Sequence, residues 1–291
     1  MILFKPSSKW LIFTFATTIS WGIWGALIEL PEKNGFPATM GYIAWALTMV
    51  PCAIIALKIA NWKLDKKPKS ILLGMAAGLT GAGGQIILFQ ALREGPAYII
   101  FPIISLYPII TILLSVSILK ESASKRQVFG ILFALAGIFL LSYSKGDNSI
   151  TQGYTWLILS GLVFLSWGTQ AYVMKFSNES MSAESIFFYM TISSLILTPI
   201  AYVMTDLSID INYGWDGAYS ALLIHFLNSI GALTLVYALR YGKAIIVVPL
   251  TGLSPLITIT LSLILYNVWP SPSLFTGMVL AIVAICLFFE E

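Results

Sequence analysis

Long apolar runs separated by short polar segments make up most of this 291-residue chain. A helix needs roughly 20 apolar residues to cross the ~30 Å hydrocarbon core of a membrane. The runs are apolar on all sides and lack the alternation of a transmembrane barrel, so each predicts a helix that satisfies its own backbone. We expect ten spans, at residues 10–29, 40–58, 71–92, 97–119, 127–143, 154–174, 184–204, 218–239, 244–266 and 274–289.

The second half of the chain repeats the first. Residues 88–118 align with residues 235–265 at an offset of 147, and 15 of the 31 aligned pairs are identical. A Ser-Trp-Gly triplet also occurs at 20–22 and again at 166–168. We therefore expect two five-helix repeats, residues 1–147 and 148–291. Because five crossings are an odd number, the second repeat enters from the opposite face, and such inverted repeats are typical of transporters.

Composition places the chain in lipid and argues against several classes of protein. The chain is 58% hydrophobic and 10% charged, which predicts an all-α integral membrane protein. Cys52 and Cys286 lie in apolar spans, where cysteine packs as a small hydrophobic residue. With one histidine and no carboxylate in the middle of a span, neither a metal site nor an acid–base pair is expected, so we predict no enzyme activity and no cofactor.

Lysine and arginine positions predict the orientation of the chain. A cytoplasmic N-terminus places 13 of the 16 basic residues in cytoplasmic segments and leaves Lys33, Arg93 and Lys145 outside. Cytoplasmic loops of membrane proteins are rich in Lys and Arg. We therefore expect both termini in the cytoplasm and a location in the cytoplasmic (inner) membrane. The net charge of +3 is then an orientation signal, and no nucleic-acid partner is expected.

Prolines and hydroxyls mark the fourth and ninth spans. Pro108 and Pro255 lie near the middle of these spans and lack the N–H that would bond the carbonyl four residues earlier, which frees the carbonyls of Ile104 and Thr251. Paired interruptions in corresponding helices indicate a transporter binding site, although kinks that only shape packing are the alternative. The nearby hydroxyls either line that site or bond within and between helices, and they are Thr111, Thr251 and Thr258.

Polar side chains also occur in the middle of other spans. Gln85, Asn228 and His225 belong to one stripe of the repeated unit, and Gln170 lies in the sixth span. Polar groups at this depth usually face the bundle interior or a wet cavity. His225 is either a neutral packing residue or a group that titrates during proton coupling.

Three tryptophans lie deep in the first and sixth spans, away from the membrane interface. Trp21 and Trp24 lie in the first span and Trp167 in the sixth, where Gln170 aligns with Trp24. They either wall a cavity or pack between helices. A cavity between the repeats would therefore differ in its two halves.

Several motifs together resemble a known family. They are the Ser-Trp-Gly triplets, Ala-Leu-Arg-x-Gly at 91–95 and 238–242, Pro-x5-Pro at 102–108 and 249–255, and Leu119-Lys120-Glu121. They resemble the drug/metabolite transporter (DMT) superfamily, specifically its EamA-type branch. The resemblance implies ten helices in two repeats and a carrier of small metabolites, with a central cavity formed by helices 1, 3, 4, 6, 8 and 9. The second copy reads Leu265-Tyr266-Asn267 and lacks the acidic residue.

These observations predict a secondary transporter that works by alternating access. We expect a small neutral or zwitterionic substrate, an amino acid or related compound, because no fixed charge lies in mid-membrane to neutralise an ion. An uptake carrier for sugars or nucleosides is the alternative. A channel would need a continuous pore lined by polar rings, and the sequence offers none. The bilayer is the expected environment, and protons as a coupling ion stay open beside facilitated diffusion.

Overall fold

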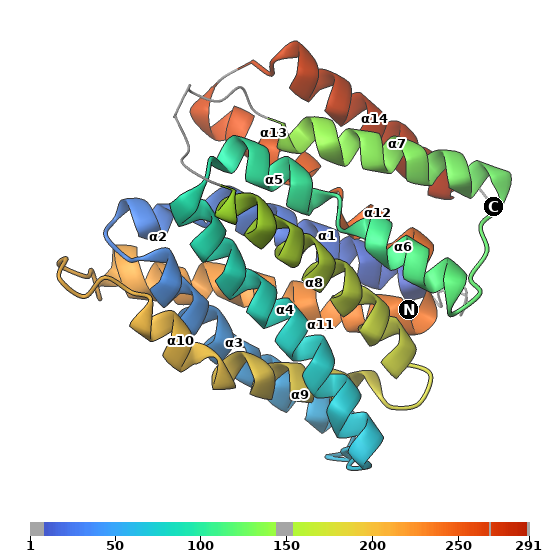
Figure 1. The fold of residues 1–291 in the computed structure, drawn as a ribbon, viewed down its shortest axis with the longest axis horizontal. Coiled ribbons are helices and arrows are strands. Elements are labelled where there is room, and N and C mark those ends of the chain that lie inside the picture. Colours follow the sequence, from blue (N-terminus) through green and yellow to red (C-terminus); the bar gives the residue numbers. More distant parts are fainter. Residues whose placement is uncertain (1–8, 144–153, 268, 290–291) are drawn as a thin grey trace, which may run out of the picture.

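The computed structural model describes residues 9–143, 154–267 and 269–289, and these residues form helices without any strand (Figure 1). The expected boundary between repeats, at residues 147 and 148, lies outside this part of the chain. The first repeat contains α1 (Lys9–Leu27), α2 (Glu29–Lys33), α3 (Ala38–Ile59), α4 (Pro68–Glu94), α5 (Ala97–Ser105), α6 (Pro108–Ser117) and α7 (Lys125–Ser142). The second contains α8 (Thr155–Ser177), α9 (Ala183–Ile196), α10 (Thr198–Val203), η2 (Trp215–Tyr219), α11 (Ser220–Tyr241), α12 (Ala244–Thr251), α13 (Ser254–Tyr266) and α14 (Pro272–Phe289).

The expected ten-span, all-α fold is confirmed. Within the described residues, nine helical segments are long and apolar enough to cross a membrane, and the shorter apolar helix Pro272–Phe288 supplies the tenth span. The α9–α10 pair forms one crossing, as do α5–α6 and α12–α13. Two of the helices begin at a serine that caps them. Ser124 and Gln127 form a capping box at α7, and the Ser182 hydroxyl accepts a hydrogen bond from the Ser185 amide at α9.

The fourth and ninth spans are broken at equivalent places. The break between α5 and α6 lies just before Pro108, and the break between α12 and α13 lies just before Pro255. The interruption expected from the prolines is therefore present in both repeats. The prediction that the carbonyl of Ile104 is free is wrong, however. The amide of Tyr107 donates to it at 3.0 Å, because the last turn tightens before the proline.

The two repeats are inverted and pack into each other (Figure 1). Helix α1 packs on α11 and α13, and its equivalent α8 packs on α4 and α6. Likewise α3 packs on α11, and α9 packs on α4, while the last helices of the repeats, α7 and α14, pack on each other. These contacts between a helix of one repeat and a helix of the other are thus matched by contacts with the repeats exchanged. This exchange is the signature of a pseudo-two-fold axis in the membrane plane.

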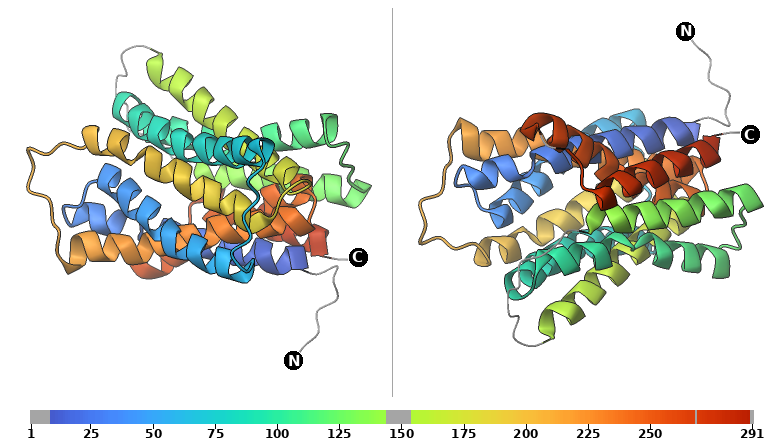
Figure 2. Two further views of the ribbon diagram at one scale, coloured as in Figure 1. Left: turned by 90° about the horizontal axis from the view of Figure 1, so that it is seen from below. Right: turned by 90° about the horizontal axis from the view of Figure 1, so that it is seen from above.

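The two ends of the bundle differ in charge. We call the end formed by residues 60–67, 118–124, 178–182 and 242–243 the basic end, because most of the described lysines lie in or beside these segments. The opposite end is formed by residues 28–37, 95–96 and 204–214. Helix α1 begins, and α14 ends, on the basic side (Figure 2).

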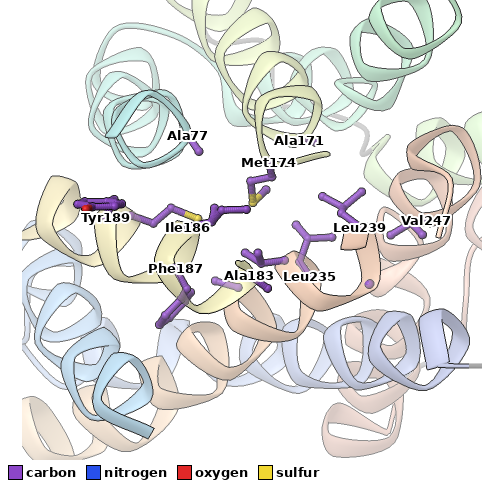
Figure 3. Packing of buried hydrophobic residues seen from close by; sticks show 14 of the residues in the cluster. Ala77, Ala171, Met174, Ala183, Ile186, Phe187, Tyr189, Leu235, Leu239 and Val247 are labelled. Atoms are coloured by element: carbon purple, nitrogen blue, oxygen red, sulfur yellow. The ribbon is translucent and has the colours of Figure 1, made fainter. Parts of the chain in front are cut away.

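The largest buried apolar cluster lies in the half of the bundle nearest the basic end. It joins α3, α4, α8, α9, α11 and α12 across both repeats. Figure 3 shows members from α4, α8, α9, α11 and α12. Small alanines alternate there with larger side chains, so the helices approach closely. Labelled members of the cluster are Ala77, Ala171, Met174, Ala183, Ile186, Phe187, Tyr189, Leu235, Leu239 and Val247.

Candidate functional site

Two indole hydrogen bonds join the repeats in matching positions. The Trp21 Nε1–H donates to the carbonyl oxygen of Asn228 at 3.3 Å. The Trp167 Nε1–H donates to the carbonyl oxygen of Gly81 at 3.2 Å. Trp21 aligns with Trp167, and Asn228 aligns with Gly81, so one contact occurs twice. Both tryptophans therefore hold helices together at the level of the candidate site.

Two threonine hydroxyls bond α1 and α8, the helices that carry these tryptophans, to α13 and α6. The Thr111 hydroxyl donates to the carbonyl of Gly168 at 2.8 Å, and the Thr258 hydroxyl donates to the carbonyl of Gly22 at 2.9 Å. The glycines allow this approach: a Cβ added at Gly22 would lie 2.5 Å from the Cβ of Ile257. The hydroxyls of Thr111 and Thr258 thus bond between helices, which is the packing alternative for these residues.

Thr251 bonds within its own helix. Its hydroxyl is fully buried and donates to the carbonyl of Val248 at 3.0 Å. Of the two prolines, Pro108 is buried and Pro255 is partly exposed, each beside the break in its span. The prolines and Thr251 shape the broken spans.

The amides of Gln85 and Gln170 lie close to one part of α4. Gln170, on α8, lies over Gly81, since a Cβ added at that glycine would be 2.0 Å from the Gln170 Nε2. Gln85 is one helical turn beyond Gly81 on the same face. Trp167 covers Gly84, where an added Cβ would be 2.7 Å from its Nε1. These three side chains form one half of the candidate site.

His225 and Trp24 form the equivalent part of the other half. The Trp24 Nε1–H donates to His225 Nδ1 at 3.2 Å, and His225 Nε2 faces Gly41. Because Nδ1 accepts this bond, the ring is neutral with its proton on Nε2, a tautomer assigned from the hydrogen bond. Asn228 follows His225 by one turn on α11. The geometry agrees with the neutral-packing alternative for His225, since an imidazolium would lose the bond from Trp24.

The three side-chain amides of this region have no partner among the described residues. Gln85, Gln170 and Asn228 are each partly exposed, and none of their side chains bonds to another described residue. A carboxamide offers two donors and one acceptor without charge. Within the described residues no group of three His, Cys, Asp or Glu side chains lies close enough to hold a metal ion. The candidate site can therefore bind a solute through uncharged hydrogen bonds and contacts with aromatic rings.

Two further residues lie in this region, although the sequence did not predict them as site residues. Tyr107 packs edge-on against Trp167 with ring centroids 6.2 Å apart. Its signal was its place directly before Pro108. Trp45, on α3, has a buried indole N–H without a partner among the described residues. It was indistinguishable from a packing aromatic in the sequence.

Comparison with known proteins identifies the family. The pattern of the EamA-like transporter family matches residues 8–143 and again residues 152–290. The chain belongs to the EamA-like transporter family. The two matches coincide with the two repeats, and with the apolar helices they make this EamA-like protein a multi-pass membrane transporter.

Relatives of this EamA-like transporter include both named and uncharacterized proteins. It is 26% identical over 273 residues to the uncharacterized inner membrane transporter YhbE of Escherichia coli K12, covering 89% of this chain and 82% of YhbE. It is 22% identical over 193 residues to protein LicB of Haemophilus influenzae, covering 64% of each chain. One crystal structure superposes with a TM-score of 0.79 at 17% identity, covering 97% of this chain and 98% of the other, which shows the fold alone.

Proposed function

We propose that this EamA-like transporter is a secondary carrier that moves a small neutral or zwitterionic metabolite, an amino acid or related compound, by alternating access. The observation that carries the proposal is the set of three unpartnered carboxamides, Gln85, Gln170 and Asn228, on helices where the repeats meet. Each can donate to and accept from a polar solute without requiring that the solute carry net charge. The inverted repeats supply the two equivalent packings that alternating access needs.

We further propose that the basic end faces the cytoplasm, in the inner membrane. Support comes from the placement of 13 of the 16 basic residues on that side. The solute would then move between the cytoplasm and the space beyond the opposite end. Export of the metabolite fits this arrangement, and proton coupling through His225 would require the ring to lose its bond from Trp24.

A carrier for sugars or nucleosides is the second candidate. The observation in its favour is the pairing of amides with the aromatic rings of Trp24, Trp167 and Tyr107, because sugar hydroxyls and nucleobases use the same two kinds of contact. Both candidates are tested together. Purified protein in proteoliposomes loaded with unlabelled amino acids, sugars or nucleosides should exchange the matching radiolabelled solute, with and without a pH gradient.

The exchange assay separates a carrier from a channel. Counterflow that saturates with solute concentration supports the carrier, whereas solute flux that does not saturate and shows no exchange supports a channel. Gln85→Ala and Asn228→Ala should each raise the half-saturation concentration, since the loss of one hydrogen bond in a binding site costs about 1 kcal/mol, roughly fivefold in affinity. Unchanged kinetics in both variants would contradict the site.

A further inference from the structure

The two ends of the bundle are packed differently although the repeats are equivalent. Helix α12, the half of the ninth span nearest the basic end, is buried at every residue. The aligned segment is α5, at the opposite end, where Phe101 is 43% exposed and its equivalent Val248 is 1% exposed. The largest apolar cluster, whose packing Figure 3 shows, also consists of residues from the basic half. The basic end is therefore packed more tightly than the opposite end in this conformation.

Two aligned serines show the same difference. Ser115, in the half of the fourth span nearest the basic end, is fully buried, and its hydroxyl has no partner among the described residues. Ser262, its equivalent at the opposite end of the ninth span, is partly exposed. A buried hydroxyl without a partner is unfavourable, and water would satisfy it if the basic end opened. Exposure of Ser115 would therefore report an opening of the basic end.

Glu121 closes the basic end by joining the two repeats. Its carboxylate oxygens accept hydrogen bonds from the amides of Ala244 and Ile245, both at 3.1 Å, in the first turn of α12. Lys175, at the end of α8, lies 3.8 Å from Glu121 and donates to the carbonyl of Gly242 at 2.8 Å. A carboxylate is favourable at a helix N-terminus, and a charged acceptor strengthens each bond. One side chain of the first repeat therefore holds two spans of the second.

The sequence of the second repeat has no carboxylate at the position aligned with Glu121. Lys120 and Asn267 both have left-handed backbone angles, φ 55° and 51°, and this shared geometry fixes the alignment of the two segments. In the sequence, the offset of 147 aligns Val268 with Glu121, one residue later than the motif suggested, and the Ser-Trp-Gly offset of 146 aligns Glu29 with Lys175. Valine can neither cap a helix nor pair with a charge. The aligned positions therefore supply this cap at the basic end and not at the opposite end.

We propose that Glu121 is a latch that keeps the basic end closed, so that without solute the candidate site opens toward the opposite end. This inference rests on the proposed carrier function, because it assigns an energetic preference to one of the two states of the cycle. A latch formed in one state alone stabilises that state, and its removal shifts the population toward the other. If the basic end faces the cytoplasm, the resting carrier is open outward.

Thiol labelling of the aligned serines tests the latch. In a chain carrying Cys52→Ala and Cys286→Ser, a single Ser115→Cys or Ser262→Cys reports each end to a membrane-impermeant thiol reagent, applied separately to intact cells and inside-out vesicles. With Glu121 intact, we expect Ser262→Cys to react and Ser115→Cys to be protected. Adding Glu121→Gln should raise the labelling rate of Ser115→Cys about tenfold and lower that of Ser262→Cys, as a shift between two states requires.

Two further variants keep the result decisive. Lys175→Met removes the ion pair with Glu121 but leaves the helix cap, so it should raise the labelling rate of Ser115→Cys by less than Glu121→Gln does. If Glu121→Gln does not fold, Lys175→Met takes its place in the test. Glu179→Gln makes the same charge change on an exposed side chain near the basic end and should change neither rate. Unchanged labelling of both serines in Glu121→Gln, or free labelling of Ser115→Cys before any latch is removed, overturns the proposal. Because labelling needs no solute, either result is independent of the counterflow test of the carrier itself.

Discussion

Arg93 and Arg240 occupy the same position in the two repeats, yet their guanidinium groups bond to opposite ends of one membrane span. Arg93 donates to the carbonyl of Met204, which follows the seventh span, Ala183–Val203. Arg240 donates to the carbonyl of Met181, which precedes that span, at 3.2 Å. Aligned residues therefore emerge at opposite ends of the bundle. The arginines tie each repeat to the seventh span in addition to ending their own helices.

The first prediction concerns the two faces of the membrane. Glu94 and Tyr241 are an aligned pair of exposed residues, each directly after one of these arginines. In a chain carrying Cys286→Ser, Glu94→Cys should react with an impermeant thiol reagent only from outside the cell. Tyr241→Cys should react only in inside-out vesicles. Reaction of both from one side would contradict the inverted repeat, whereas exchange of the two sides would contradict the orientation alone.

The second prediction concerns the glycines that let the repeats touch. A Cβ at Gly22 would lie 2.5 Å from the Cβ of Ile257, and one at Gly168 would lie 2.4 Å from the Cβ of Ile110. These neighbours are branched and lie next to the backbone, so they cannot move aside cheaply. Gly22→Ala and Gly168→Ala should each destabilise the folded protein by about 1–3 kcal/mol, as overpacking does.

Thermal unfolding in detergent, followed by the loss of monodisperse protein, measures this effect. Gly83→Ala is the matched control, because an added Cβ there meets nothing within 4 Å and alanine favours the helix. If Gly22→Ala and Gly168→Ala unfold at the same temperature as Gly83→Ala, the helices are not as close as the structure places them.

Much of the fold could be predicted from the sequence, since it follows from length and repetition. Hydropathy located the spans, and helices such as α3 and α11 differ from the expected bounds by no more than three residues. The offset of 147 predicted both the inversion and the paired breaks before Pro108 and Pro255. These features depend on single segments or on pairs of aligned segments, and a sequence contains both kinds of information.

The hydrogen-bond partner of each polar side chain could not be predicted in the same way. Thr111 and Thr258 have the spacing of cavity residues, but their hydroxyls meet glycine carbonyls of helices 57 and 236 residues away in the chain. Only the packing decides which neighbour a hydroxyl meets. Glu121 shows the same limit, because its partners on α12 come from the other repeat.

The third prediction separates residues of the candidate site from residues that hold helices together. Gln170→Ala removes an amide with no described partner, so it should raise the half-saturation concentration for solute several-fold, with little change in stability. Thr111→Val removes a buried bond to Gly168 and leaves that carbonyl without its donor, so it should cost about 1–3 kcal/mol of stability with unchanged affinity. Counterflow kinetics and thermal unfolding of the same two variants make the comparison. The reverse result would assign Thr111 to the site and Gln170 to packing.

The last prediction concerns Asp65, which joins the α3–α4 loop to the start of α9 at the basic end. The Ser182 amide and hydroxyl both donate to its carboxylate at 2.9 Å. The backbone bond from Ser182 is the main cause of a lowered pKa of Asp65, with further lowering by the hydroxyls of Ser182 and Ser185 and by the charge of Lys67. A pKa lower in the folded state means that the contact is fully present above the ordinary pKa of about 3.9 and is lost as pH falls through the lower folded value.

Asp65→Asn should therefore unfold at a lower temperature than the unaltered protein at pH 6, and the difference should shrink as the pH falls below about 3.9 toward the lowered pKa of the folded state. Asp65 is partly exposed, so screening limits the effect to about 0.5 kcal/mol, or roughly 1–2 °C. Asp210→Asn changes an exposed carboxylate at the opposite end and is the control. A difference between Asp65→Asn and the unaltered protein that stays constant from pH 6 to pH 3 would mean that the ionised carboxylate does not hold the loop.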